Sequence, residues 1–174
     1  EPMPDQVDWD LLVVREGLSI ALHDLVGRAA GLPVHALLGG LRRASMPGMP
    51  VIHVGPPEVM VRRAAKWTRA GYRYLKVKFR GDLNVDVEAI RAIRAAVGPD
   101  IHLAVDANAG YRSLDDAARA IESLKPCGID YFEDMLDADN AQIAQLRKRT
   151  GARIMIDRQA WWPHIHHIVQ AGAA

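Results

Sequence analysis

The sequence has little cysteine, no long apolar run and no excess of charge, and each of these absences excludes a class of protein. Cys127 is the single cysteine, so no disulfide can form within the chain, and we expect a reducing, cytoplasmic location. We interpret Cys127 as a small buried residue in a loop. No stretch approaches the roughly 20 apolar residues that cross a bilayer, so we expect no membrane association.

The beginning of the chain and its charge exclude further classes. Glu1-Pro2-Met3-Pro4-Asp5 is acidic and rich in proline, unlike a signal peptide, and the missing initiator methionine suggests a cut or processed chain. The formal net charge is +1 at pH 7, and no basic run supports nucleic-acid binding. At 174 residues, 49% of them hydrophobic, the chain suits one domain with a sizeable core.

Strand and helix patterns alternate through most of the sequence. A helical pattern covers about residues 11–30, where Gly31 and Pro33 are expected to end it. We expect residues 1–49 to form a helical and loop lead-in, and residues 50–174 to form a repeat of β/α units. The strand patterns lie near residues 50–54, 74–79, 101–106, 129–133 and 153–157, and the helical patterns near residues 56–70, 85–97, 114–124, 140–150 and 163–171.

This alternation predicts parallel strands joined by crossover helices. Strands that begin at residues 74, 101, 129 and 153 are 27, 28 and 24 residues apart. An open doubly wound sheet and a β/α barrel both fit this spacing, but a complete barrel needs eight strands and this chain supplies five. Either the sheet is open, or the sequence is part of a barrel.

Three consecutive strand patterns end in a carboxylate, at Asp106, Glu133 and Asp157. Ligands of parallel α/β folds bind beyond the carboxyl ends of the strands, and neighbouring strands lie about 4.8 Å apart, so these side chains can converge. Carboxylates without sulfur or imidazole ligands suit Mg²⁺, with Mn²⁺ as a second possibility. The alternative is that the acids only form turns and helix caps.

Lys76 and Lys78 stand at i and i+2 and therefore share one face of their strand. If that face lines the site, like charge and partial burial lower a lysine pKa, and such a lysine can act as a general base. We predict Lys78 as the base, because it is nearer the carboxyl end, and Lys76 as its companion. The alternative is an edge strand that lysines protect from aggregation.

A histidine cluster, His164, His166 and His167, follows Trp161 and Trp162. Histidine clusters can bind metal, but these lie at the start of a helix rather than at a strand end. We therefore favour surface packing for the histidines. The tryptophans either line the mouth of the site or pack.

Taken together, these motifs resemble the mandelate racemase/muconate-lactonizing branch of the enolase superfamily. The match runs from about residue 11 to the end, and its ordered combination is specific. The residues that carry it are 21–33 (ALHDLVGRAAGLP), 37–40 (LLGG), 76–78 (KVK), 105–108 (VDAN), 132–134 (FED) and 156–157 (ID).

The resemblance implies a modified TIM barrel, of which about five βα units are present, and a capping domain that is largely absent from this chain. It implies Mg²⁺ held by Asp106, Glu133 and Asp157, with Asn108 just outside the metal shell. It also implies that Lys78 removes the proton α to a carboxylate, beside Lys76, and that the metal stabilises the enediolate.

The sequence departs from the pattern of this branch at two positions. Met135 stands where the family often has a proline, and Arg158 stands where an acid commonly follows the fifth-strand ligand. Strand alternation should point Arg158 away from Asp157. The strands that would supply a second acid/base are also absent from this sequence.

We therefore expect part of an enzyme that abstracts the α-proton of a small-molecule carboxylate substrate, as a racemase, epimerase, cycloisomerase or acid-sugar dehydratase. We expect this stretch alone to be inactive and the protein to be a homo-oligomer. The alternatives are a non-catalytic half-barrel that serves binding or assembly, and an open flavodoxin-like Mg²⁺-binding domain. The lysine face and the Leu37–Gly40 segment argue against the open domain.

Overall fold

A computed structural model describes residues 9–160 and 164–174. The chain divides into two compact units, Glu1–Met46 and Pro47–Ala174, which are described separately. The first unit contains α1 (Trp9–Ala30) and the short α2 (Val34–Leu37). Gly31 ends α1 as expected, in the left-handed conformation at φ 65°.

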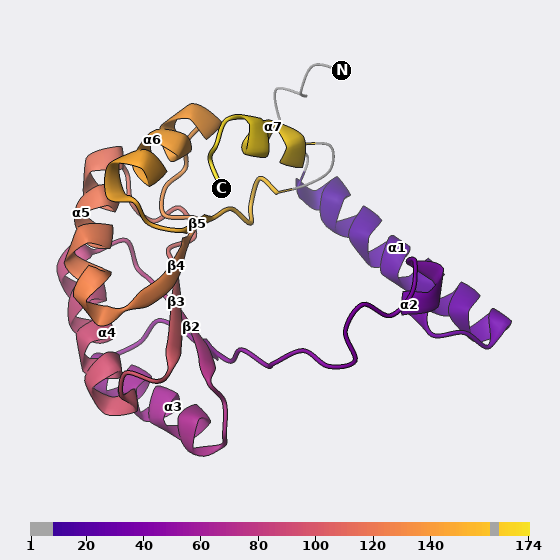
Figure 1. The fold of residues 1–174 in the computed structure, drawn as a ribbon, viewed down its shortest axis with the longest axis horizontal. Helices are drawn as coiled ribbons and strands as arrows, with labels where there is room; N and C mark the ends of the chain where they lie inside the picture. Colours follow the sequence, from indigo (N-terminus) through magenta and orange to yellow (C-terminus); the bar gives the residue numbers. More distant parts are fainter. Residues whose placement is uncertain (1–8, 161–163) are drawn as a thin grey trace. The chain divides into compact units, whose positions relative to one another are not determined.

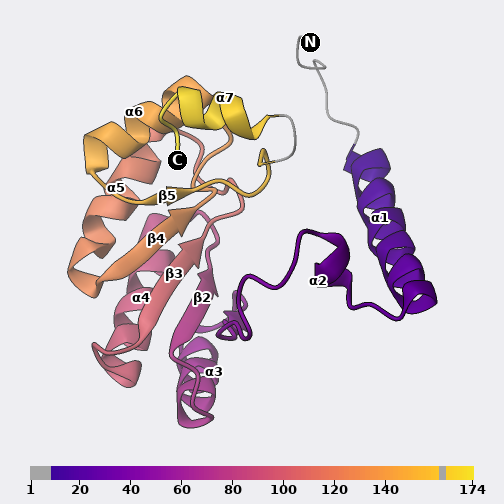
Figure 2. The ribbon, with the colours of Figure 1, turned by 45° about the vertical axis from the view of Figure 1, so that its right-hand side comes forward.

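The second unit is a parallel sheet with the strand order β1-β2-β3-β4-β5. Figures 1 and 2 show the strands labelled β2 to β5 side by side in the order of the sequence. The strands are β1 (Val51–Ile52), β2 (Tyr74–Lys78), β3 (His102–Asp106), β4 (Ile129–Glu133) and β5 (Ile154–Met155). The helices are α3 (Pro57–Arg69), α4 (Leu83–Val97), α5 (Leu114–Leu124), α6 (Asn140–Thr150) and α7 (Ile165–Gln170), with a short 3₁₀ helix, η1 (Lys125–Cys127).

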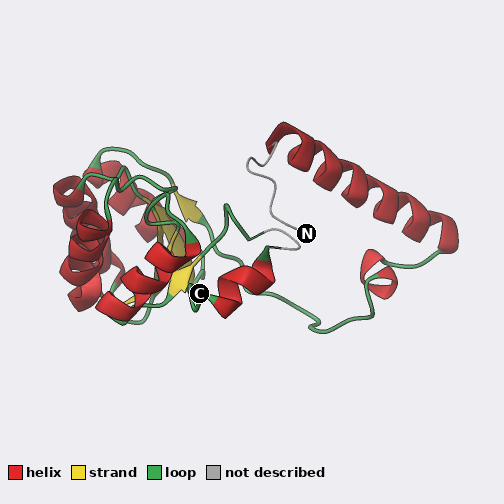
Figure 3. Ribbon diagram, turned by 90° about the horizontal axis from the view of Figure 1, so that it is seen from above, coloured by secondary structure: helices red, strands yellow, loops and turns green. Residues whose placement is uncertain are grey.

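Helices α3 to α6 cover one face of this sheet, as Figures 1 and 3 show. A doubly wound sheet carries helices on both faces, whereas a β/α barrel carries them only on the outside. The one-sided arrangement therefore identifies the sheet as part of a barrel and excludes the open flavodoxin-like alternative.

Strand alternation separates apolar from charged side chains across the sheet. Leu75, Val77, Leu103 and Val105 are fully buried and belong to the core that the helices cover. Burial of each such side chain stabilises the folded state by about 1.5–3 kcal/mol. The residues that alternate with them, which include Lys76 and Lys78 of β2 and Asp106 of β3, are on the opposite face.

The register aligns the ends of the three central strands. Lys78 of β2 pairs with Asp106 of β3, and Asp106 pairs with Glu133 of β4. These three residues therefore form one row across the sheet, with Lys76 two residues earlier on the same face of β2.

The outer strands are shorter than the sequence pattern indicated. The expected strands at residues 50–54 and 153–157 are observed only at Val51–Ile52 and Ile154–Met155. Both lie at an edge of the sheet, where a strand can pair on one side only, and this limits the extent of the ladder. Among the described residues, no helix is long and apolar enough to cross a membrane.

Candidate active site at the strand ends

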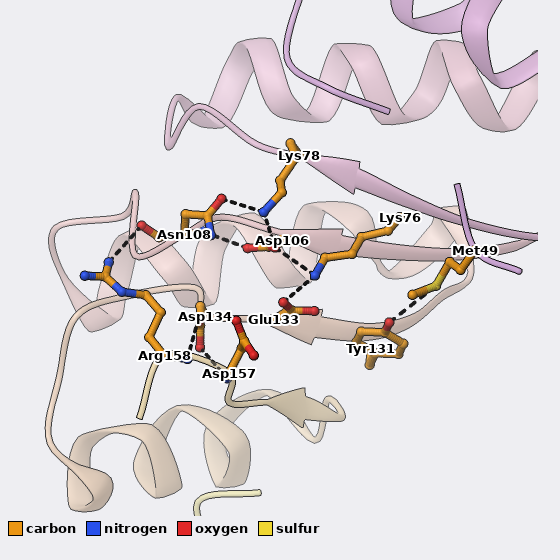
Figure 4. A network of polar contacts seen from close by, with 10 residues as sticks. All are labelled: Met49, Lys76, Lys78, Asp106, Asn108, Tyr131, Glu133, Asp134, Asp157 and Arg158. Atoms are coloured by element: carbon orange, nitrogen blue, oxygen red, sulfur yellow. Dashed lines mark hydrogen bonds and ion pairs between the residues drawn. The ribbon is translucent and has the colours of Figure 1, made fainter. Parts of the chain in front are cut away.

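Four charged side chains from three neighbouring strands meet on the face of the sheet that the helices leave open (Figure 4). Lys78 Nζ lies 2.6 Å from Asp106 Oδ2, and Lys76 Nζ lies 3.0 Å from the same oxygen. Lys76 Nζ also donates a hydrogen bond to Glu133 Oε1. The structure thus brings Lys76, Lys78, Asp106 and Glu133 together.

The acids of this cluster are buried more deeply than the lysines. Asp106 is 1% exposed and Glu133 2%, whereas the Lys76 and Lys78 side chains are 17% and 25% exposed. Two buried carboxylates therefore face two ammonium groups that can still contact solvent. Such a pair of carboxylates requires compensating cations, because isolated buried charges are costly.

The surroundings shift the pKa values of three of these groups. Burial raises the pKa of Asp106, but hydrogen bonds from Lys78, Lys76 and its own loop backbone outweigh it, so the pKa is lowered. Burial raises the pKa of Glu133, and the hydrogen bond from Lys76 does not fully offset this. The two acids therefore differ in how readily they take up a proton.

The pKa of Lys76 is raised, although burial on its own would lower it. Burial lowers the pKa, but hydrogen bonds to Glu133 and Asp106 and their charges outweigh it and raise the pKa above the ordinary lysine value. Sequence reasoning considered the neighbouring lysine and burial, and it missed the compensation by acids of adjacent strands. The raised pKa favours the ammonium form of Lys76.

Asn108 joins this cluster from the loop after β3. Its side-chain Oδ1 accepts a hydrogen bond of 2.8 Å from Lys78 Nζ, and its backbone N–H donates to Asp106 Oδ1 at 2.9 Å. Asn108 and Ala109 are both left-handed, at φ 45° and 61°. Backbone strain of this kind is concentrated at functional sites.

Asp157 is held at the same end of the sheet through its backbone. Its N–H donates to Asp134 Oδ1 at 3.0 Å, and the N–H of Arg158 donates to Asp134 Oδ2 at 3.1 Å. Figure 4 shows this link between Asp157 and Asp134. The Asp157 side chain is exposed, and among the described residues it does not join Asp106 and Glu133 in a group that could hold a metal ion, so the expected convergence of the three acids is not seen. Sequence reasoning gave Asp134 no role of its own, although an acid directly after a strand-end glutamate was a signal for one.

The donor chemistry of the site fits a divalent cation such as Mg²⁺. Glu133 Oε2 is buried and has no hydrogen-bond partner among the described residues, so it can accept a ligand. Within residues 9–160 and 164–174, however, no three acids, histidines or cysteines are close enough together to hold a metal. The Lys76 ammonium occupies the space between Asp106 and Glu133, where a cation would contact both.

The histidine cluster lies apart from these residues. His164 is buried, and its Nε2 is 3.0 Å from the Asn140 side-chain nitrogen of α6. His167 is in ring contact with both His164 and His166. Trp161 and Trp162, which we expected to line the mouth or to pack, are outside the described residues.

Comparison with known proteins identifies the family. The model of the enolase C-terminal domain-like family matches residues 59–174. The chain belongs to the enolase C-terminal domain-like family. The resemblance to the mandelate racemase/muconate-lactonizing branch is thereby confirmed, as is the partial enolase-type barrel.

Relatives within the family are racemases and epimerases. The N-succinyl-L-Arg/Lys racemase of Bacillus cereus is 31% identical over 156 residues, which is 89% of this chain and 42% of that protein. The solved structure of a dipeptide epimerase from Cytophaga hutchinsonii, complexed with Mg and D-Ala-L-Val, has a TM-score of 0.80 at 30% identity, over 88% of this chain and 42% of that one. A mandelate racemase/muconate lactonizing family protein from Azoarcus sp. EbN1 has a TM-score of 0.81 at 34% identity, over 88% of this chain and 41% of that one. The chain thus spans about two fifths of the length of these relatives.

The two departures from the family pattern have distinct structural places. Met135 is 1% exposed, and its carbonyl accepts the backbone N–H of Tyr111, so it packs beneath the loop after β3. Arg158 follows the end of β5, where strand alternation no longer applies, and its Nη1 donates to the carbonyl of Asn108 at 3.3 Å. Arg158 thus spans the edge of the site from β5 to the β3 loop.

Proposed function

We propose that this chain is part of an enzyme that removes the α-proton of a small-molecule carboxylate substrate, as a racemase, epimerase, cycloisomerase or dehydratase does. The observation that carries the proposal is the cluster in which Lys76 and Lys78 meet Asp106 and Glu133 at the strand ends. Relatives named as racemases, epimerases and dehydratases support the same class of reaction.

Lys78 is the proposed base. It ends β2, in the row of Asp106 and Glu133, and its ammonium group is held from two sides by Asp106 and Asn108. A base must come within about 3 Å of the proton that it takes, directly or through one water. The backbone of Lys76 lies two residues earlier, roughly 6–7 Å further from the strand end, and its ammonium reaches back to Asp106 and Glu133. We assign Lys76 to the substrate carboxylate, which an ammonium can bind.

The proposed metal ligands are Asp106, Glu133 and Asp157, with Mg²⁺ as the cation and Mn²⁺ as a substitute. When bound, the metal offsets the negative charge that develops on the substrate carboxylate as its α-proton leaves. The unpartnered Oε2 of Glu133 supports this assignment, as does the Mg in the related dipeptide epimerase structure. Asn108 is proposed as a neighbour of the metal site that holds Lys78.

The division of the chain and its assembly belong to the same proposal. Residues 1–49 would lead from a capping domain into the barrel, and residues 50–174 would supply the first part of the barrel. We propose a homo-oligomer of the complete protein. The substrate would be a small molecule such as an N-acyl amino acid or a dipeptide, since relatives are named for these.

Exchange of the substrate α-hydrogen with deuterated solvent tests the proposal in the protein at its full natural length. N-succinyl amino acids and dipeptides would be incubated in D₂O with Mg²⁺, and the α-proton signal followed by NMR. Lys78→Ala should abolish exchange on the face that Lys78 serves, and Lys78→Arg should not restore it, because guanidinium stays protonated. Lys76→Ala should slow exchange without abolishing it.

Lys125→Ala is the matched control. Lys125 is an exposed lysine paired with Glu122, away from the strand ends, so its loss should leave exchange unchanged. If Lys76→Ala is inactive and Lys78→Ala exchanges normally, the two roles are reversed. If neither change affects exchange, the lysines are structural, and a binding or assembly module becomes the better interpretation of this barrel segment.

A further inference from the structure

One buried acid near the site has no role in the proposed chemistry. Asp86 is in the first turn of α4 and is 3% exposed. Its Oδ1 accepts the backbone N–H of Arg80 at 2.9 Å, and its Oδ2 accepts the backbone N–H of Gly81 at 3.0 Å and the hydroxyl of Tyr111 at 2.9 Å. Among the described residues, no lysine or arginine side chain forms an ion pair with it, so only these three donors compensate its burial.

These donors come from the loop that follows the candidate base and from the loop that carries its amide partner. Arg80 and Gly81 lie just beyond the end of β2, two and three residues after Lys78. Tyr111 is three residues after Asn108, in the loop that follows β3. The Asp86 carboxylate therefore joins the β2–α4 loop to the β3–α5 loop.

The two loops also touch through their backbones. Gly81 is left-handed, at φ 81°, and a Cβ at this position would overlap the backbone of Gly110. Below this contact, the N–H of Phe79 donates to the carbonyl of Asp106 at 2.8 Å. Because the two glycines are in contact, Tyr111 lies close enough to Asp86 for its hydroxyl to donate the hydrogen bond. Tyr111 is only 3% exposed, so this hydrogen bond is buried.

We infer that Asp86 and Tyr111 form a clasp that positions Lys78 against Asn108. The kinetic consequence rests on the proposed function, while the clasp itself rests on the hydrogen bonds. A displacement of about 1 Å in a reacting group can reduce a rate by about 100-fold. The clasp keeps the chain that follows Lys78 in register with the loop that bears Asn108, and this keeps the ammonium between its two partners.

Two variants of the full-length protein test this inference. Tyr111→Phe removes the hydroxyl and keeps the buried ring, and Asp86→Asn keeps the shape but replaces one acceptor oxygen with a donor. Asp82→Asn is the matched control, because Asp82 caps the same helix through the N–H groups of Asn84 and Val85, and asparagine caps equally well.

The first readout is independent of activity. Formaldehyde with dimethylamine–borane methylates accessible lysines, and peptide mass spectrometry gives the rate at each one. We expect Tyr111→Phe to raise the rate at Lys78 at least threefold, with Lys76 and Lys125 unchanged and the control equal to wild type. An unchanged rate at Lys78 overturns the inference, and so does an equal rise at all lysines, which indicates general loosening.

The second readout is α-hydrogen exchange. Both variants should lower kcat about tenfold, with KM and Mg²⁺ affinity within twofold of wild type. A loss of Mg²⁺ affinity that matches the loss of kcat overturns the positioning role. If wild type itself shows no exchange, the proposed function fails, and the methylation rates alone decide for or against the clasp. Should Asp86→Asn fail to fold, Tyr111→Phe decides the matter.

Discussion

Replacing Lys76 with methionine should make Mg²⁺ bind more tightly. The Lys76 ammonium lies 3.0 Å from Asp106 Oδ2 and donates to Glu133 Oε1, so it would compete with the proposed metal for the same oxygens. Methionine has a similar length and no charge, and it leaves both carboxylates free for the cation. Loss of the ammonium also strengthens the repulsion between the two acids, which a cation relieves.

The expected gain follows from the burial of the pair. Two unit charges 3.0 Å apart attract by about 5 kcal/mol at an effective dielectric constant of about 20. Removing one partner of a buried pair costs about 3–5 kcal/mol. Because the Lys76 side chain is 17% exposed and regains water when displaced, we take about half of this, roughly 2 kcal/mol. That corresponds to about a 30-fold lower Mg²⁺ dissociation constant.

Isothermal titration of the full-length protein with MgCl₂, at fixed pH and ionic strength, measures this gain. Lys78→Met is the matched variant, because Lys78 contacts Asp106 but does not contact Glu133 and should give a smaller gain. Equal or weaker Mg²⁺ binding by Lys76→Met would refute the reasoning, since it would show that metal and ammonium do not share these oxygens.

Four further predictions concern the same unit. Glu133→Gln should weaken Mg²⁺ binding at least about 100-fold, because a buried carboxylate is lost; equal binding in the same titration removes Glu133 as a ligand. Asp134→Asn should weaken Mg²⁺ binding about 10- to 100-fold, since the amide can no longer accept on both sides and Asp157 loses its support; unchanged binding contradicts this. Burial raises the pKa of Asp86 in the folded protein, so Asp86 holds its proton more tightly in the folded than in the unfolded chain. The contribution of Asp86 to stability therefore falls as the pH rises from the ordinary aspartate pKa through the raised pKa of the folded protein. Over this pH range, the thermal midpoint of Asp86→Asn should therefore fall less than that of wild type. Plots of thermal midpoint against pH that run parallel for the two proteins would contradict this prediction. Residues 50–174, expressed alone, should self-associate because β1 and β5 leave open edges, and a compact monomer in sedimentation would contradict this.

The sequence predicted the central strands well, because their polar residues stand at alternate positions. In β2, apolar Leu75 and Val77 alternate with Lys76 and Lys78, which places the lysines on one face, and the structure brings those lysines to the acids of β3 and β4. The pattern could not distinguish a barrel from an open sheet, since both use buried parallel strands. The one-sided placement of the helices decides this, and it depends on packing that periodicity does not describe.

Other features depend on contacts between distant residues, which a sequence pattern does not show. Asp86 and Asp134 are ordinary acids in the sequence. Their roles come from hydrogen bonds to backbone N–H groups of other loops, so these roles become visible only in three dimensions.

The aligned row of Lys78, Asp106 and Glu133 also has a consequence for how the sheet assembles. If β3 slipped by one residue against β2 and β4, Asp106 would turn toward the helices and Val105 would turn toward the charged face. A carboxylate under the helices would have no ammonium partner, and unpaired buried charge is costly. The residues that we assign to chemistry thus penalise misaligned pairing, and replacing them with neutral residues should make the sheet less selective among its possible registers while it folds.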